Sequence, residues 1–98
     1  MMMYELRYEG FPIDDDLHEK LLLACRRFLL ELGADRPVQL LVKQIDGQVQ
    51  GRVEVHLPGR WITALVQRTD PVEALEAAMQ TARDAITAAA DLDPTGTG

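Results

Sequence analysis

The stretch PVQLLVKQIDGQVQGRVEVHLPGRWITALVQR, residues 37–68, decides the fold of this chain. It contains three segments in which apolar and polar residues alternate, which is the pattern of half-buried strands. The dipeptides Asp46-Gly47 and Pro58-Gly59 separate these segments, and both favour tight turns. The stretch therefore predicts an antiparallel meander of three strands.

The alternation gives the predicted meander two different faces. One face is apolar and consists of Val38, Leu40, Val42, Val53, Val55, Leu57, Ile62, Ala64 and Val66. The other face is mixed and carries Gln39, Leu41, Lys43, Arg52, Glu54, His56, Trp61, Thr63 and Leu65. Trp61 is the largest apolar group of the mixed face, and two interpretations of it stay open. It anchors a dimer or a binding partner, or it covers the sheet or packs under the C-terminal tail.

A capped helix follows the meander, in the stretch TDPVEALEAAMQTARDAI, residues 69–86. Asp70 is a good N-cap and Pro71 suits the first helical position. An apolar stripe follows at helical spacing and consists of Val72, Leu75, Met79, Ala82 and Ile86. We expect one domain over residues 1–90 and a disordered tail over residues 91–98, since DLDPTGTG has turn formers and no apolar pattern.

One strand and one further helix precede the meander. MYELRYE, residues 3–9, alternates like a half-buried strand. A helix is predicted from about Asp15 to Leu32, with an apolar stripe at spacings of three and four that consists of Leu17, Leu21, Cys25, Phe28 and Leu32. The element order is therefore β-α-β-β-β-α. The sequence predicts an α+β fold in which two helices pack on one face of a four-stranded sheet.

Leu23 and Leu30 of the first helix lie roughly opposite its apolar stripe. Two interpretations stay open: they are surface leucines, or they form a contact with a second copy or another protein. The second interpretation predicts a protein interface at Leu23, Leu30 and Trp61.

Composition narrows the function classes. The 98 residues carry 47% apolar residues and a net charge of −6, which argues against broad, non-specific phosphate binding. The single cysteine cannot form an internal disulfide, so we expect a reducing, cytoplasmic setting. The longest apolar run, LLLAC, is too short to span a bilayer, and no membrane association is expected.

No pattern in the chain predicts an enzyme. His18 and His56 are isolated from any metal-binding spacing, and Cys25 falls within the apolar stripe of the first helix as a core thiol. The run Asp14 to Asp16 is interpreted as a solvated helix cap, and there is no glycine-rich phosphate loop. We therefore expect no catalytic residue, metal, cofactor or small-molecule substrate.

Three stretches carry a family resemblance: IDDDLHEKL (13–21), VEVHLPGRWITALVQ (53–67) and DPVEALEAAMQTARDAI (70–86). With the element order, they resemble the ribosome hibernation promoting factor and ribosome-associated inhibitor family, also called sigma-54 modulation or ribosomal subunit interface proteins. Within that family this chain would be a diverged, acidic member. It departs from the family pattern in having no basic residue after Arg83.

The resemblance implies a bacterial, stress-linked regulator of translation. Such proteins bind ribosomal RNA in the decoding region of the small subunit, inhibit translation and stabilise idle ribosomes. The positions that match their RNA contacts are Lys20, Arg26, Arg27 and Arg83, with His18 as an addition. The alternative is a protein-interaction or self-associating module, as a homodimer or with a protein partner, that reuses the fold without binding ribosomal RNA.

Overall fold

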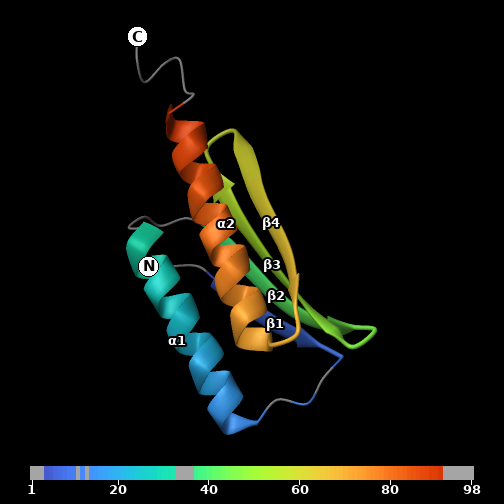
Figure 1. Ribbon diagram of the computed structural model, residues 1–98. Helices are drawn as coiled ribbons and strands as arrows, with labels where there is room; N and C mark the ends of the chain where they lie inside the picture. Colours follow the sequence, from blue (N-terminus) through green and yellow to red (C-terminus); the bar gives the residue numbers. More distant parts are fainter. Residues whose placement is uncertain (1–3, 11, 13, 33–36, 92–98) are drawn as a thin grey trace.

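A computed structural model describes residues 4–10, 12, 14–32 and 37–91, without the side chains of residues 89–91. The element order β-α-β-β-β-α and the α+β class are as predicted (Figure 1). The elements are β1 (Tyr4–Glu9), α1 (Asp15–Leu32), β2 (Val38–Ile45), β3 (Gln48–Leu57), β4 (Arg60–Arg68) and α2 (Pro71–Asp91).

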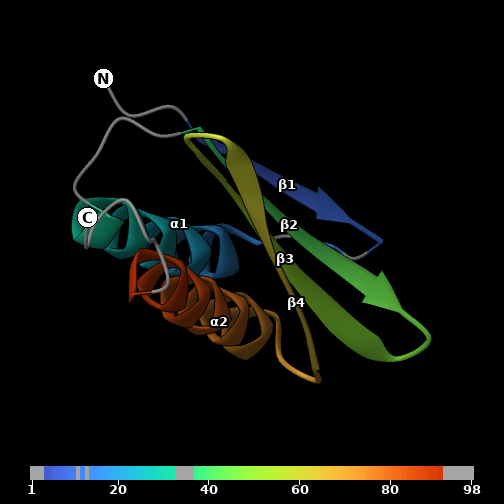
Figure 2. The same ribbon diagram turned by 90° about the horizontal axis from the view of Figure 1, so that it is seen from above.

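The four strands form one sheet in the order β1-β2-β3-β4. β2, β3 and β4 are antiparallel neighbours, as the two predicted turns require, while β1 pairs parallel with β2. A parallel pair needs a long crossover, and α1 supplies it. Both helices lie on the same face of the sheet, with α2 over the β3–β4 side (Figure 2). The opposite side, which carries no helix, is called the open sheet face below.

The core lies between the sheet and the two helices. Of the alternating residues of β2 and β3 predicted to face inward, Leu57 is partly buried and the others are buried. Helix α1 contributes Leu21, Cys25, Phe28 and Leu29. Among the residues that the structure describes, no buried residue is polar or charged. The prediction that Cys25 is a core thiol is confirmed, because its side chain is fully buried.

Helix α2 packs unusually close to β3. A Cβ atom built on Gly51 would lie 2.3 Å from the carbonyl oxygen and 2.6 Å from the carbonyl carbon of Ala74. Ala74, Ala78 and Ala82 are all fully buried, so the face of α2 that meets the sheet has small side chains at its closest points. Glycine in the strand and alanine in the helix therefore fix the distance between the two layers.

Both helices begin at an aspartate cap. The Asp14 carboxylate accepts a hydrogen bond from the backbone N–H of Leu17 at 2.7 Å, and the Asp70 carboxylate accepts one from Glu73 at 2.9 Å. These bonds satisfy helix N–H groups that have no partner within the helix. Helix α2 continues past Ile86 to Asp91. The rest of the predicted disordered tail, residues 92–98, lies outside the described residues.

The Gly51 contact predicts a steric effect of one added methyl group. Replacing Gly51 with alanine should lower the free energy of unfolding by about 3 kcal/mol, because the new Cβ meets backbone atoms that cannot rotate away. Chemical denaturation measures this change. The matched control is Gln50→Ala on the same strand, which should change stability by about 0.5 kcal/mol or less. Equal stability of both variants would show that α2 does not depend on this contact.

Candidate nucleic-acid interface

The solvent-facing side of α1 gathers five of the residues predicted to bind RNA or protein. At 100° per residue, these side chains lie on the arc opposite the buried positions Leu21, Cys25 and Phe28. All five are exposed, and this set is called the α1 outer face: Lys20, Leu23, Arg26, Arg27 and Leu30. The leucines contribute apolar surface, with 58% of Leu23 and 69% of Leu30 exposed.

Positive charge on the α1 outer face concentrates at its C-terminal half. Lys20 Nζ lies 3.1 Å from Asp16 Oδ2, one helical turn earlier, and hydrogen bonding to this carboxylate raises the pKa of Lys20. Glu19 adds a further carboxylate near the same end. From Lys20 to Leu30 the helix carries no other acidic residue. The net positive part of the surface is therefore the Arg26–Arg27 pair.

Arg26 and Arg27 have no ion pair within the part of the chain that the structure describes. Both side chains are exposed and remain available to an anion. Arg26 also borders a hollow of about 330 Å³ between α1 and the edge strand β1, together with Tyr4, Leu29 and Leu30. A guanidinium beside apolar side chains can bind a phosphate while the sugar or base of the same nucleotide covers the apolar part.

Arg83, the fourth predicted RNA contact, connects the two helices instead of standing free. Its Nε lies 2.5 Å from Glu31 Oε2 on α1, an ion pair rather than a well-aligned hydrogen bond. Its Nη1 donates to Gln80 Oε1 at 2.9 Å, and its guanidinium carbon lies 5.4 Å from the centre of the Phe28 ring. The side chain is only 30% exposed. Arg83 thus helps to hold α1 against α2.

The solvent-facing side of α2 is acidic. Its exposed residues include Glu73, Glu76, Gln80, Asp84 and Thr87. Gln80 donates a hydrogen bond to Asp84 at 3.0 Å, which leaves both glutamates and Asp84 as negative charges facing water. This helix would repel phosphate. Of the two helices, only α1 therefore has a surface that could bind an anion.

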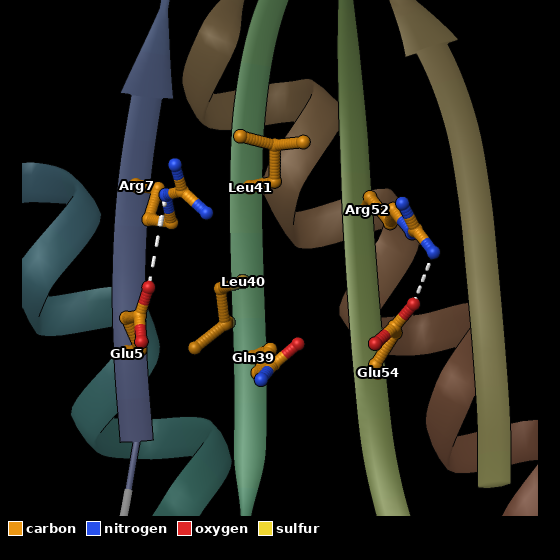
Figure 3. Close-up of a pocket in the computed structure, with 7 residues that line it drawn as sticks. All are labelled: Glu5, Arg7, Gln39, Leu40, Leu41, Arg52 and Glu54. Atoms are coloured by element: carbon orange, nitrogen blue, oxygen red, sulfur yellow. Dashed lines mark hydrogen bonds and ion pairs between the residues drawn. The ribbon is translucent and has the colours of Figure 1, made fainter.

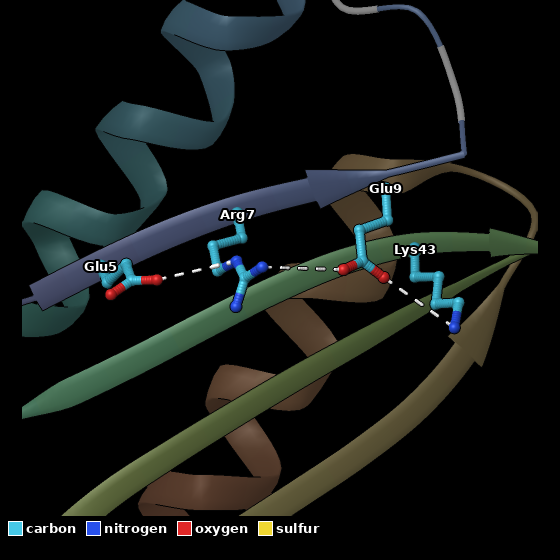
Figure 4. A network of polar contacts seen from close by, with 4 residues as sticks. All are labelled: Glu5, Arg7, Glu9 and Lys43. Carbon is cyan, nitrogen blue, oxygen red and sulfur yellow. Dashed lines mark ion pairs between the residues drawn. The ribbon is translucent and has the colours of Figure 1, made fainter.

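The open sheet face carries charges of both signs in close pairs. Along β1, Arg7 lies between Glu5 at 3.7 Å and Glu9 at 4.0 Å, and Lys43 of β2 lies 3.8 Å from Glu9 (Figure 4). The pair between Lys43 and Glu9 was not predicted, because it depends on which residues of β1 and β2 are neighbours.

A shallow hollow of about 190 Å³ crosses the same face, between β1 and β3 (Figure 3). Its polar lining is internally paired: Arg7 reaches Glu5, and Arg52 contacts Glu54. Each cation of the hollow therefore has a carboxylate partner already. The hollow has no excess charge to select an anion or a cation.

Trp61 lies far from the two leucines with which it was grouped. It stands on the open sheet face, where its ring stacks on His56 with ring centres 4.3 Å apart and planes 4° from parallel. Leu23 and Leu30 lie on α1, on the other side of the sheet (Figure 2). The three residues do not form one surface, and a protein contact would use either the leucines or the tryptophan.

His18 joins α1 to β1. Its Nδ1 lies 3.0 Å from the hydroxyl of Tyr8 in a hydrogen bond, and the two rings meet edge to face at 6.0 Å. Burial raises the pKa of the Tyr8 hydroxyl, so this group stays protonated at neutral pH. His18 therefore has a contact within the fold besides its predicted contribution to RNA binding.

The described residues contain no group of side chains that could bind a metal ion, and their one cysteine is not reactive. No three of their His, Cys, Asp or Glu side chains are grouped as metal ligands would be. Burial raises the pKa of the Cys25 thiol to about 12, which keeps it protonated and unreactive. No helix in these parts of the chain is long and apolar enough to cross a membrane.

Comparisons with known proteins confirm the fold. No family model and no curated protein matches the chain. Two solved structures are similar over nearly their whole length. The Thermus thermophilus Protein Y N-terminal domain has 16% sequence identity and a TM-score of 0.69, covering 90% of this chain and 98% of that chain. A ribosomal subunit interface protein from Coxiella burnetii has 16% identity and a TM-score of 0.71, covering 89% and 96%.

The shared feature is the fold. At 16% identity the likeness does not extend to individual residues. The architecture that the family resemblance implied is therefore confirmed, and the predicted RNA contacts stay predictions.

The Arg83 contacts predict a measurable coupling between the helices. Arg83→Met keeps the aliphatic stem but removes the charge, and it should lower the free energy of unfolding by about 1 kcal/mol. Glu31→Gln should cost less, because the ring of Phe28 still faces the guanidinium. A double-mutant cycle by chemical denaturation should give a coupling of about 0.5 kcal/mol between Arg83 and Glu31. Strictly additive effects would contradict the pairing.

The Cys25 environment predicts slow thiol chemistry. In the folded protein the thiol should resist alkylation at pH 8, and it should react fully once denaturant unfolds the chain. Because the folded-state pKa is raised from 9.0 to about 12, the protein should lose stability as pH rises between these values. The Cys25→Ser variant serves as the unreactive control in the alkylation assay. Rapid labelling of the native protein would mean that the core opens readily.

Proposed function

We propose that this chain is a cytoplasmic, ribosome-associated protein that binds the small subunit through the α1 outer face. In this role it would inhibit translation or stabilise idle ribosomes. The observation that carries the proposal is the adjacent pair of exposed arginines, Arg26 and Arg27, which have no ion pair among the described residues of an acidic chain. The chain shares its fold with a protein named as a ribosomal subunit interface protein, and this likeness supports the proposal of ribosome association.

The two arginines suit RNA for physical reasons. A guanidinium offers a planar fork of donors that matches phosphate oxygens and does not lose its charge at any physiological pH. Leu23 and Leu30 flank the arginines with exposed apolar surface. Such surface can cover the apolar parts of unstacked nucleotides. Sequence-specific RNA recognition mostly targets single-stranded segments, where the bases are unstacked.

The net negative charge of the chain limits the surfaces through which the protein can bind RNA. Negative charge on α2 repels phosphate, so the protein cannot coat RNA in an arbitrary orientation. In this proposal binding uses the α1 outer face, with Lys20 adding charge when a phosphate competes with Asp16. Arg83 takes part indirectly, because its contacts with Glu31 and Phe28 hold α1 in position.

Co-sedimentation with purified small ribosomal subunits tests the proposal. The protein should move with the subunit at low salt and dissociate as salt rises, because phosphate contacts release counterions. Arg26→Glu/Arg27→Glu should reduce binding strongly, and the salt slope of the binding constant should fall by about 2 for two lost phosphate contacts.

The matched control is Arg60→Glu/Arg68→Glu, which changes the net charge by the same amount on β4, away from α1. This control should keep most of the binding. Equal losses in the two double variants would mean that only the net charge matters. Protein that stays at the top of the gradient at low salt would overturn ribosome binding altogether.

A further inference from the structure

The two edges of the sheet are protected to very different degrees. β1 spans only Tyr4–Glu9, and every second residue of it is charged. β4 is longer, and its interior, WITALVQ, contains no charge, proline or glycine. Its pairing with β3 runs without a bulge from Arg68 to Arg60. Natural edge strands normally carry a charge, a proline or a bulge to prevent pairing, and the interior of β4 has none of these.

The turn between β3 and β4 determines which backbone groups of β4 are free. Pro58-Gly59 is a two-residue turn, and it closes on the pair Leu57 and Arg60. In such a hairpin the closing pair exchanges both hydrogen bonds, and every second pair along the ladder does the same. The intervening residues of β4 therefore turn their N–H and C=O groups to the free edge: Trp61, Thr63, Leu65 and Gln67.

We propose that β4 pairs antiparallel with β4 of a second copy of this chain, about a two-fold axis at Thr63. The two four-stranded sheets then become one continuous sheet. Thr63 faces Thr63 of the second copy, and Trp61 faces Leu65 of the second copy in both directions. All of these residues have outward-facing backbone groups, as a hydrogen-bonded antiparallel pair requires. The contact is isologous, so it closes as a dimer.

The side chains of β4 favour this register over its neighbour. Trp61 is 53% exposed and Leu65 is 56% exposed, and the proposed register places each against the other. Pairs of aromatic and aliphatic side chains, and pairs of threonines, stabilise antiparallel strands. A register centred on Ala64 would instead place Arg60 opposite Arg68 and separate the two apolar residues. Like charges directly opposite destabilise a sheet.

Helix α2 leaves room for the second copy. It lies over β3 and β4, so its axis is about one strand spacing from the proposed two-fold axis. The two α2 helices would then lie about 10 Å apart, a normal distance for packed helices. The flank of α2 that points away from α1 has short, uncharged side chains: Ala77, Thr81, Ala85 and Ala88.

The contact between Gly51 and Ala74 aligns this flank with the axis. Gly51 pairs with Val66, so Ala74 lies close to Val66 along the sheet. From Val66 to Thr63 the strand advances about 10 Å, which corresponds to about seven residues of helix. Thr81, in the middle of the short-chain flank, therefore lies near the two-fold axis.

This dimer leaves the α1 outer face exposed, so it is independent of the proposed RNA contact. Sedimentation of the protein alone across a wide range of concentration tests it, because a dimer should form as concentration rises. Leu65→Arg should weaken dimerisation by about tenfold or more, since it replaces the apolar side chain that faces Trp61 of the second copy with a charged one. The matched control is Leu30→Arg, an exposed leucine on α1, which should leave the dimer intact.

Cross-linking tests the register directly. In a hydrogen-bonded antiparallel pair the Cα atoms are about 5.5 Å apart, within the range of a disulfide. Thr63→Cys should give a covalent dimer with a mild oxidant, while Thr87→Cys, on the solvent side of α2, should not. The native Cys25 is buried and does not interfere. Circular dichroism confirms that each variant is folded.

Three results would overturn the dimer. The protein would remain monomeric at every concentration, or Leu30→Arg would disrupt the dimer while Leu65→Arg would not, or the two cysteine variants would cross-link equally. None of these results bears on ribosome binding, which is measured with the small subunit and the Arg26→Glu/Arg27→Glu variant.

Discussion

The close approach of two backbones, at Gly51 of β3 and Ala74 of α2, sets the geometry of the helical layer. Because no side chain separates them, α2 lies low on the sheet along its alanine face. This position brings Arg83 within reach of Glu31 and over the ring of Phe28, so α1 is held beside α2. The orientation of α1 follows, and with it the outward direction of its arginines and leucines.

The distribution of charge matters more for this protein than its sum. A net charge of −6 suggests a molecule that avoids nucleic acid. However, Arg7, Lys43 and Arg52 are paired with carboxylates on the open sheet face, and Arg83 is engaged between the helices. Half of the negative excess lies on α2, while α1 presents two arginines that have no ion pair among the described residues. An acidic protein can therefore carry one local surface that attracts phosphate.

The sequence predicted the elements well because their signals are local. Alternation in residues 37–68 located the strands, and Asp70 marked the start of α2. The helical period also placed Leu23 and Leu30 correctly on the outside of α1. The stacking of His56 on Trp61 was within reach, since a two-residue turn at Pro58-Gly59 makes these residues neighbours.

Contacts between distant segments could not be predicted in the same way. The pairing of Arg83 with Glu31 depends on how the two helices lie on the sheet, and the pairing of Lys43 with Glu9 depends on a parallel register set through α1. The sequence indicates only that Gly51 belongs to a strand, and its close contact with Ala74 depends on where α2 lies on the sheet. For the same reason the sequence predicted Arg83 only as an RNA contact and not as the link between the helices that its contacts make it.

Hydroxyl-radical footprinting with and without small ribosomal subunits tests the central claim most directly, because it reports side-chain exposure at each face in one experiment. If α1 is the binding face, the exposed Leu23 and Leu30 should be oxidised less when subunits are present. Trp61 and Leu65 on the open sheet face should be oxidised equally in both samples at the same protein concentration. Protection of Trp61 and Leu65 by the subunit, with Leu23 and Leu30 unchanged, would contradict binding through α1.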